Sequence, residues 1–206
     1  MGLLAVLVLA AVFIVWYIVG SVWNRRLARR IANEMKDALL AQGGTSKVQW
    51  FGTTAFRMTT QGANPPFGEI SVVVTLQSRE MPINWGVGLL QGRRDVAVLE
   101  ASLRKSPRVG FEVVNPESRV GRRRSRARSS WSECTLAGHR FLLATKNESA
   151  VRELLENLGG EALPPFSAIH LTAGSEPGIA ASLTVVPGRI STAVAALRNL
   201  AEKVTT

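Results

Sequence analysis

The hydrophobic pattern of the chain begins with an unbroken apolar run over residues 2–23, which contains no charged side chain. A helix of this length spans about 33 Å, and the hydrocarbon core of a bilayer is about 30 Å thick. A buried helix of a soluble protein usually keeps a polar face, and this run has none. The pattern therefore predicts one membrane-spanning helix.

The next segment, residues 24–42, combines an apolar stripe with basic side chains. Leu27, Ile31, Met35 and Leu39 recur at helical spacing, and two glycines after residue 42 favour the end of a helix. We expect this helix either to continue the span as a stalk or to lie along the lipid headgroups with its apolar stripe down.

Alternation of inward and outward positions then predicts a series of strands. The residues that mark these strands are Val48, Trp50, Thr54, Phe56 and Met58; Ile70, Val72, Val74 and Leu76; Ile83, Trp85, Val87 and Leu89; Val96 and Val98; Val109, Phe111 and Val113; and Leu136, Phe141 and Leu143. We expect the first two of these segments to form an antiparallel pair.

The last part of the chain predicts two helices and two strands. Asn147 is a favourable helix cap, and Glu148 follows in the first turn. Two strands are expected at residues 166–172 and 179–186, followed by a helix over residues 188–204 with a continuous apolar stripe.

These elements predict an α+β protein. An N-terminal transmembrane helix (residues 1–23) is followed by a basic juxtamembrane helix (24–44) and by a cytoplasmic domain (45–206). We expect the domain to be a mostly antiparallel β-sheet with two packed helices, and to contain a disordered Arg-rich loop at about residues 115–132.

Two features favour a retained anchor over a cleaved signal peptide. The run is longer than the apolar core of a signal peptide, and Trp16, Tyr17 and Trp23 suit the membrane–water boundary. Cleavage at a small-residue pair such as Gly20-Ser21 is the alternative. Because arginines follow the run and none precedes it, we expect a cell-membrane protein with its N-terminus outside and its C-terminal domain in the cytoplasm.

The net charge of +10 is concentrated in two short segments. Ten arginines occupy them: Arg25, Arg26, Arg29, Arg30, Arg119, Arg122, Arg123, Arg124, Arg126 and Arg128. Without these ten, the remaining 15 Lys and Arg balance the 15 Asp and Glu. The second segment admits three interpretations: attachment to anionic lipid, capture of RNA or another polyanion, or a solvated linker without a partner.

The sequence shows no motif that is typical of catalysis or metal binding. Cys134 and His139 are the closest candidate nucleophile and base, and only a turn between them would bring them together. His170 points outward if its neighbours Ile169 and Leu171 face the core. We therefore expect no cofactor and no metal.

The sequence favours a single-pass membrane-anchored protein whose cytoplasmic domain is a non-catalytic interaction or scaffold module at the membrane surface. Its expected partners are the lipid bilayer through residues 2–23, anionic lipid, and a protein in a membrane complex; nucleic acid is not expected. One alternative is a membrane-tethered enzyme with an unrecognised site built from scattered polar residues such as Asp95 and Glu100. The other is a membrane-tethered RNA or polyanion binder.

Overall fold

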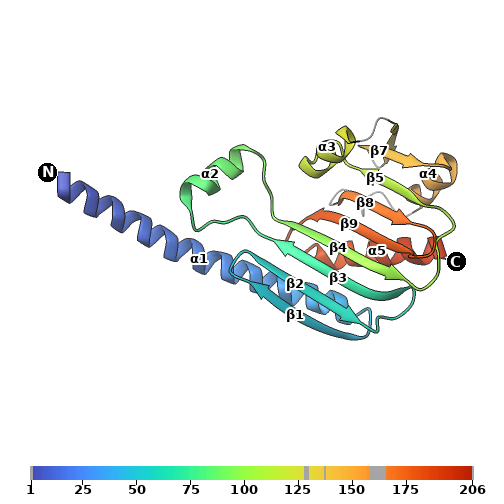
Figure 1. The fold of residues 1–206 in the computed structure, drawn as a ribbon, viewed down its shortest axis with the longest axis horizontal. Coiled ribbons are helices and arrows are strands. Elements are labelled where there is room, and N and C mark those ends of the chain that lie inside the picture. Colours follow the sequence, from blue (N-terminus) through green and yellow to red (C-terminus); the bar gives the residue numbers. More distant parts are fainter. Residues whose placement is uncertain (1, 128–129, 137, 158–165, 206) are drawn as a thin grey trace.

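The structure is a computed structural model that describes residues 2–127, 130–136, 138–157 and 166–205. The described residues form five helices and one nine-stranded sheet (Figure 1). The helices are α1 (Gly2–Leu40), α2 (Pro82–Leu90), α3 (Arg119–Arg126), α4 (Glu148–Glu156) and α5 (Ile190–Thr205). The strands are β1 (Thr45–Phe51), β2 (Ala55–Gln61), β3 (Phe67–Thr75), β4 (Val96–Leu103), β5 (Phe111–Val114), β6 (Ser132–Leu136), β7 (His139–Thr145), β8 (Phe166–Thr172) and β9 (Gly178–Thr184).

The sheet has the strand order β1-β2-β3-β4-β9-β8-β5-β7-β6, and all neighbouring strands are antiparallel. The predicted α+β class and antiparallel sheet are confirmed. Strands β8 and β9 insert between β4 and β5, so the C-terminal part of the chain joins two halves of the sheet. The connection between β3 and β4 contains α2, and the connection between β5 and β6 contains α3.

Helix α1 continues without a break from the apolar run into the folded domain. Its C-terminal half lies with α5 along one face of the sheet (Figure 1). Ile31, Met35 and Leu39 are at most 1% exposed in the hydrophobic core. Residues 24–40 therefore form a core helix, which replaces both the free stalk and the helix lying on headgroups that we had expected.

Helix α1 also supplies the N-terminal cap of α5. The carboxylate oxygens of Glu34 accept hydrogen bonds from the backbone N–H groups of Gly188 and Ile190, both at 2.9 Å. Near the middle of α5, Arg198 donates to the side-chain oxygen of Gln42, which follows α1, at 3.0 Å. Polar contacts thus join the two segments in addition to their shared apolar surface.

Many of the predicted elements are confirmed, but two of the predicted strands are each divided into a pair, β1 with β2 and β6 with β7. Strands β3, β4, β5, β8 and β9 and helix α5 occupy the expected segments, and β2 pairs with β3 as predicted. The first alternating segment is a hairpin of two strands, β1 and β2, because the chain turns at Gly52. The Asn147 side chain caps α4 as expected, by accepting from the N–H of Ala150.

Helix α3 stands where we expected a flexible arginine-rich loop. The Ser118 hydroxyl caps this helix by accepting from the N–H of Gly121 at 2.8 Å. Gly121 permits the close packing, since a Cβ atom there would lie 1.8 Å from the carbonyl oxygen of Asn115. Arginine is also a strong helix former, so the composition is compatible with a short capped helix.

Candidate membrane-contact site

Helix α2 occupies the segment that we expected to form a third strand, so that prediction was wrong. Pro82 stands at the start of the helix, where the missing N–H of proline leaves no hydrogen bond unmade. The chain carries no charge from Met81 to Gln91. Ile83 is 69% exposed and Leu90 is 90% exposed. A short helix with large apolar side chains in solvent indicates a surface that contacts something apolar outside the domain.

Three tryptophans join α2 to the apolar segment of α1. The ring of Trp85 lies 6.0 Å from that of Trp16 and 6.2 Å from that of Trp23, centroid to centroid. The guanidinium carbon of Arg79 lies 5.7 Å from the centroid of the Trp23 ring. Helix α2 therefore lies beside residues 16–23, the last turns of the apolar run (Figure 1).

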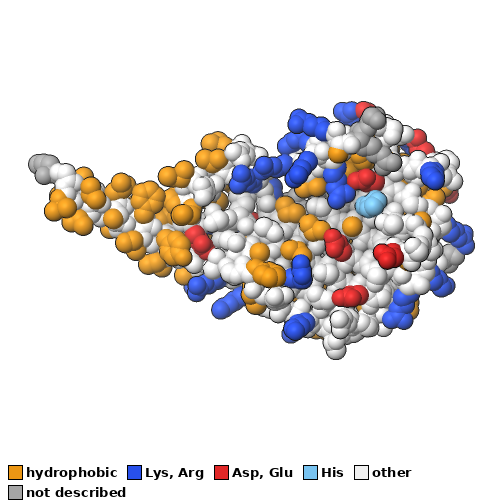
Figure 2. Space-filling view, viewed as in Figure 1, with side chains coloured by type: hydrophobic (Ala, Val, Ile, Leu, Met, Phe, Trp, Pro, Cys, Tyr) orange, Lys and Arg blue, Asp and Glu red, His pale blue; other side chains and the backbone are white. Residues whose placement is uncertain are grey.

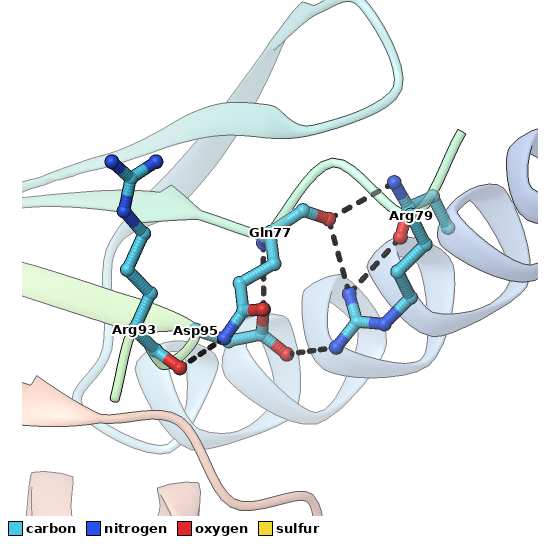
Figure 3. Close-up of polar contacts among 5 residues, drawn as sticks. Gln77, Arg79, Arg93 and Asp95 are labelled. Carbon is cyan, nitrogen blue, oxygen red and sulfur yellow. Dashed lines mark hydrogen bonds and ion pairs between the residues drawn. The ribbon is translucent and has the colours of Figure 1, made fainter. Parts of the chain in front are cut away.

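Four polar residues link the ends of the α2 segment to α1, and Figure 3 labels three of them, Gln77, Arg79 and Asp95. We call these residues, Asn24, Gln77, Arg79 and Asp95, the clasp. Arg79 donates to the side-chain oxygen of Asn24 at 3.0 Å and pairs with the Asp95 carboxylate at 2.8 Å. The other oxygen of Asp95 accepts from the N–H of Gln77 at 2.7 Å, and the Asn24 amide donates to the Gln77 carbonyl at 3.1 Å.

The clasp is shielded from solvent. Asn24 is fully buried, and the side chains of Arg79 and Asp95 are each only 13% exposed. A buried ion pair is costly to desolvate unless hydrogen bonds satisfy its remaining polar atoms, and here Asn24 and Gln77 supply them. The clasp therefore holds the chain before and after α2 in one fixed position against α1.

Close approach of the two segments depends on Gly20. A Cβ atom on Gly20 would lie 2.3 Å from the carbonyl oxygen of Arg79. The same carbonyl accepts a hydrogen bond from the indole N–H of Trp16 at 3.1 Å. The loop before α2 therefore packs directly against the backbone of one turn of α1.

The arginines that the sequence singled out lie in two separate places. Arg25, Arg26, Arg29 and Arg30 are exposed on α1, directly after the contact with α2. Five others lie on α3: Arg119, Arg122, Arg123, Arg124 and Arg126. Arg124 pairs with Glu112 at 2.9 Å. Arg128 lies outside the described residues.

Two cavities lie along the arginines of α3, and the larger one also reaches the segment that follows α2. The larger has a volume of about 590 Å³ and is lined by Arg93, Arg94, Arg119 and Arg122. The second, of about 490 Å³, continues along α3 and is lined almost wholly by arginines. Figure 2 shows Lys and Arg side chains gathered in this region, beside the apolar surface of α2 and α1.

The candidate catalytic residues are not brought together. Cys134 stands opposite Phe141 in the hairpin of β6 and β7, whereas the exposed His139 stands opposite Leu136. His170 is exposed, as expected from the burial of both its neighbours. Within the described ranges, no group of three or more His, Cys, Asp or Glu side chains could hold a metal ion.

Burial makes the one cysteine a poor nucleophile, and this is testable. Cys134 is 3% exposed, and burial raises the pKa of its thiol above the ordinary value. At neutral pH little thiolate forms, so we expect iodoacetamide to alkylate the native chain at least about tenfold more slowly than the unfolded chain. Mass spectrometry of timed samples measures the rate. Alkylation of the native chain faster than that of free cysteine would instead indicate an activated thiol.

No protein-family model matches the chain, and no curated protein matches it significantly.

Sequence reasoning missed the residues that build the site. Arg79, Trp85, Arg93 and Arg94 were not recognised, and Asp95 was grouped with scattered polar residues of a possible enzyme. One available signal was the uncharged stretch from residue 81 to 92, bounded by Arg79 and Glu80 before it and by two arginines after it. That arrangement is typical of a short segment at a membrane surface.

Proposed function

We propose that the chain is a single-pass membrane-anchored protein whose cytoplasmic domain is a non-catalytic interaction module held against the membrane surface. In the structure, α1 is the one described helix that is long and apolar enough to cross a membrane. The observation that carries the proposal is the position of α2 against the last turns of that segment. Placing α2 in the bilayer surface would remove from water several side chains that each contribute about 1.5–3 kcal/mol when buried.

The aromatic residues at the end of β1 support the same placement of the domain against the membrane, on a second side of α1. Trp50 and Phe51 are both nearly half exposed there. Trp50 lines a cavity of about 450 Å³ together with Arg25 and Arg29 of α1. Aromatic rings with adjacent arginines suit the headgroup region, where the rings reach the apolar side and the guanidinium groups reach phosphate.

The contacts of Trp16 and Gly20 support a retained anchor. Cleavage at Gly20-Ser21 would remove both residues and expose the loop of Arg79 that packs on them. Orientation follows from Arg25, Arg26, Arg29 and Arg30, which lie next to the span on the side of the folded domain. The positive-inside tendency places that side in the cytoplasm.

Cysteine accessibility in cells tests the position of α2 and the orientation together. In a Cys134→Ala background, Leu90→Cys and Val98→Cys are expressed separately, and a membrane-impermeant maleimide is applied. Val98 is 39% exposed on β4, whereas Leu90 is 90% exposed. In water Leu90→Cys would therefore react faster, and a covering bilayer reverses this order.

We expect Val98→Cys to be labelled only after the cells are opened, and Leu90→Cys to stay at least about tenfold less reactive until the membrane is dissolved in a denaturing detergent. Ile83→Cys should behave like Leu90→Cys. Rapid labelling of Leu90→Cys in opened cells would place α2 in water. Labelling of Val98→Cys in intact cells would show the opposite orientation.

A further inference from the structure

We infer that the larger arginine-lined cavity is a binding site for the phosphate-bearing headgroup of an anionic lipid in the cytoplasmic leaflet. This inference rests on the proposed function, because it requires α2 to lie in the membrane surface. It identifies a ligand and adds Arg93 and Arg94 to the residues that contact it. We define the basic cavity by the side chains of Arg93, Arg94, Arg119 and Arg122.

The basic cavity is formed by segments that are distant in the sequence. Arg93 and Arg94 follow the C-terminal end of α2 at the start of β4, while Arg119 and Arg122 project from α3. The end of β3 and the strands β8 and β9 complete the wall. Its volume of about 590 Å³ lies within the range of small-molecule sites, which is about 300–1,000 Å³.

The charge of the lining selects an anion. Four arginines line the cavity, and Glu117 is the acidic residue among its described lining residues. Arg122 uses one nitrogen to donate to the carbonyl of Glu117 at 2.7 Å. No ion pair joins any of the four arginines to a carboxylate among the residues that the structure describes. Arginine binds phosphate through two parallel hydrogen bonds, so unpaired guanidinium groups in a cavity favour this ligand.

The position of the cavity favours a lipid over a soluble phosphate compound. Its Arg93–Arg94 wall begins three residues after Leu90, the most exposed apolar side chain of α2. With α2 in the apolar boundary, these two arginines lie at the level of the headgroups. A lipid could then place its phosphate in the basic cavity while its acyl chains remain beside α2 and α1. In Figure 2 the basic side chains lie directly beside the apolar surface of these helices.

Native mass spectrometry of the full-length chain tests the inference. The chain is released from detergent micelles that contain equal amounts of phosphatidylglycerol and phosphatidylcholine. We expect phosphatidylglycerol to be retained preferentially, and expect the Arg93→Gln/Arg119→Gln double variant to retain at least about tenfold less of it. The matched control is Lys105→Gln/Lys146→Gln, which removes the same charge from exposed positions at the opposite end of the sheet.

Each outcome decides between ligands. Equal loss in both double variants would show a general charge effect and overturn the site. Displacement of phosphatidylglycerol by inorganic phosphate or by a short RNA oligonucleotide at equal concentration would assign the cavity to a soluble anion instead. No preference for phosphatidylglycerol, combined with protection of Leu90→Cys in membranes, would overturn the headgroup site and leave the proposed function standing. If phosphatidylglycerol is retained but Leu90→Cys reacts rapidly with maleimide in opened cells, α2 lies in water. That result would overturn the proposed position of α2 in the membrane surface and the placement of the cavity at the headgroups.

Discussion

A fragment that begins at Gly43 should fail to fold, whereas a fragment that begins at Asn24 should fold. The shorter fragment lacks the half of α1 that contributes Ile31, Met35 and Leu39 to the core. Truncation of one large core side chain costs about 2–5 kcal/mol, so the loss of three is comparable to the whole stability of a domain, about 5–15 kcal/mol. The fragment also loses the Glu34 carboxylate that caps α5.

Circular dichroism and thermal unfolding in mild detergent measure this difference. The fragment from Asn24 keeps the core half of α1 and serves as the matched control, because it lacks the same apolar span. We expect the control to unfold cooperatively and the shorter fragment to show no cooperative transition. A synthetic peptide of residues 24–42 should restore the transition if the missing helix is the cause. Cooperative unfolding of the shorter fragment alone would mean that α1 is dispensable to the core.

The sequence was sufficient to predict the parts of the fold that follow the rules of soluble domains. Strand β3 alternates as a half-buried sheet requires, β8 and β9 are short apolar segments separated by a turn, and α5 has an unbroken apolar stripe. The stripe on residues 24–40 was also visible. Its partner was not, because periodicity shows that a face is buried without showing whether lipid or protein covers it.

Helix α2 could not be predicted by the same reasoning. Ile83, Trp85, Val87 and Leu89 alternate as in a strand, but Leu90 extends the apolar surface around the helix. Alternation indicates a strand only where the intervening positions face water. In a nine-residue helix that is apolar on most sides, the pattern no longer distinguishes the two structures, and the proline at its start was the better signal.

The candidate site was hidden for a different reason. Asn24 and Gln77 are separated by 53 residues, and Arg79 and Asp95 by 16. No local pattern relates these residues, because the contact depends on how the β3–β4 connection folds back on α1. The arginines of α3 were identified from composition alone, while their neighbours Arg93 and Arg94 were not, since the cavity forms only in three dimensions.

Replacement of Arg79 by methionine should destabilise the chain strongly and release α2 from α1. Methionine keeps much of the apolar stem but removes the donor to Asn24 and the charge beside Asp95. Removal of one partner from a buried ion pair costs about 3–5 kcal/mol, because the other charge remains in a poorly solvated place. Here Asn24 would also lose the partner of its buried side-chain oxygen. Urea unfolding of the full-length chain in detergent micelles measures the change.

Arg140→Met is the matched control, because Arg140 pairs with Glu133 where both side chains are more than half exposed. Exposed pairs contribute about 0–1 kcal/mol, so this variant should be nearly neutral. Adding Asp95→Asn to Arg79→Met should recover part of the loss of stability, since the amide oxygen can still accept from Gln77 and no buried charge remains unpaired.

The release of α2 from α1 is measured separately, as a faster reaction of Leu90→Cys with maleimide in membranes. If Arg79→Met and Arg140→Met unfold at the same urea concentration, the clasp does not hold the two segments together, and the apolar contacts of Trp16, Trp23 and Trp85 must do so alone.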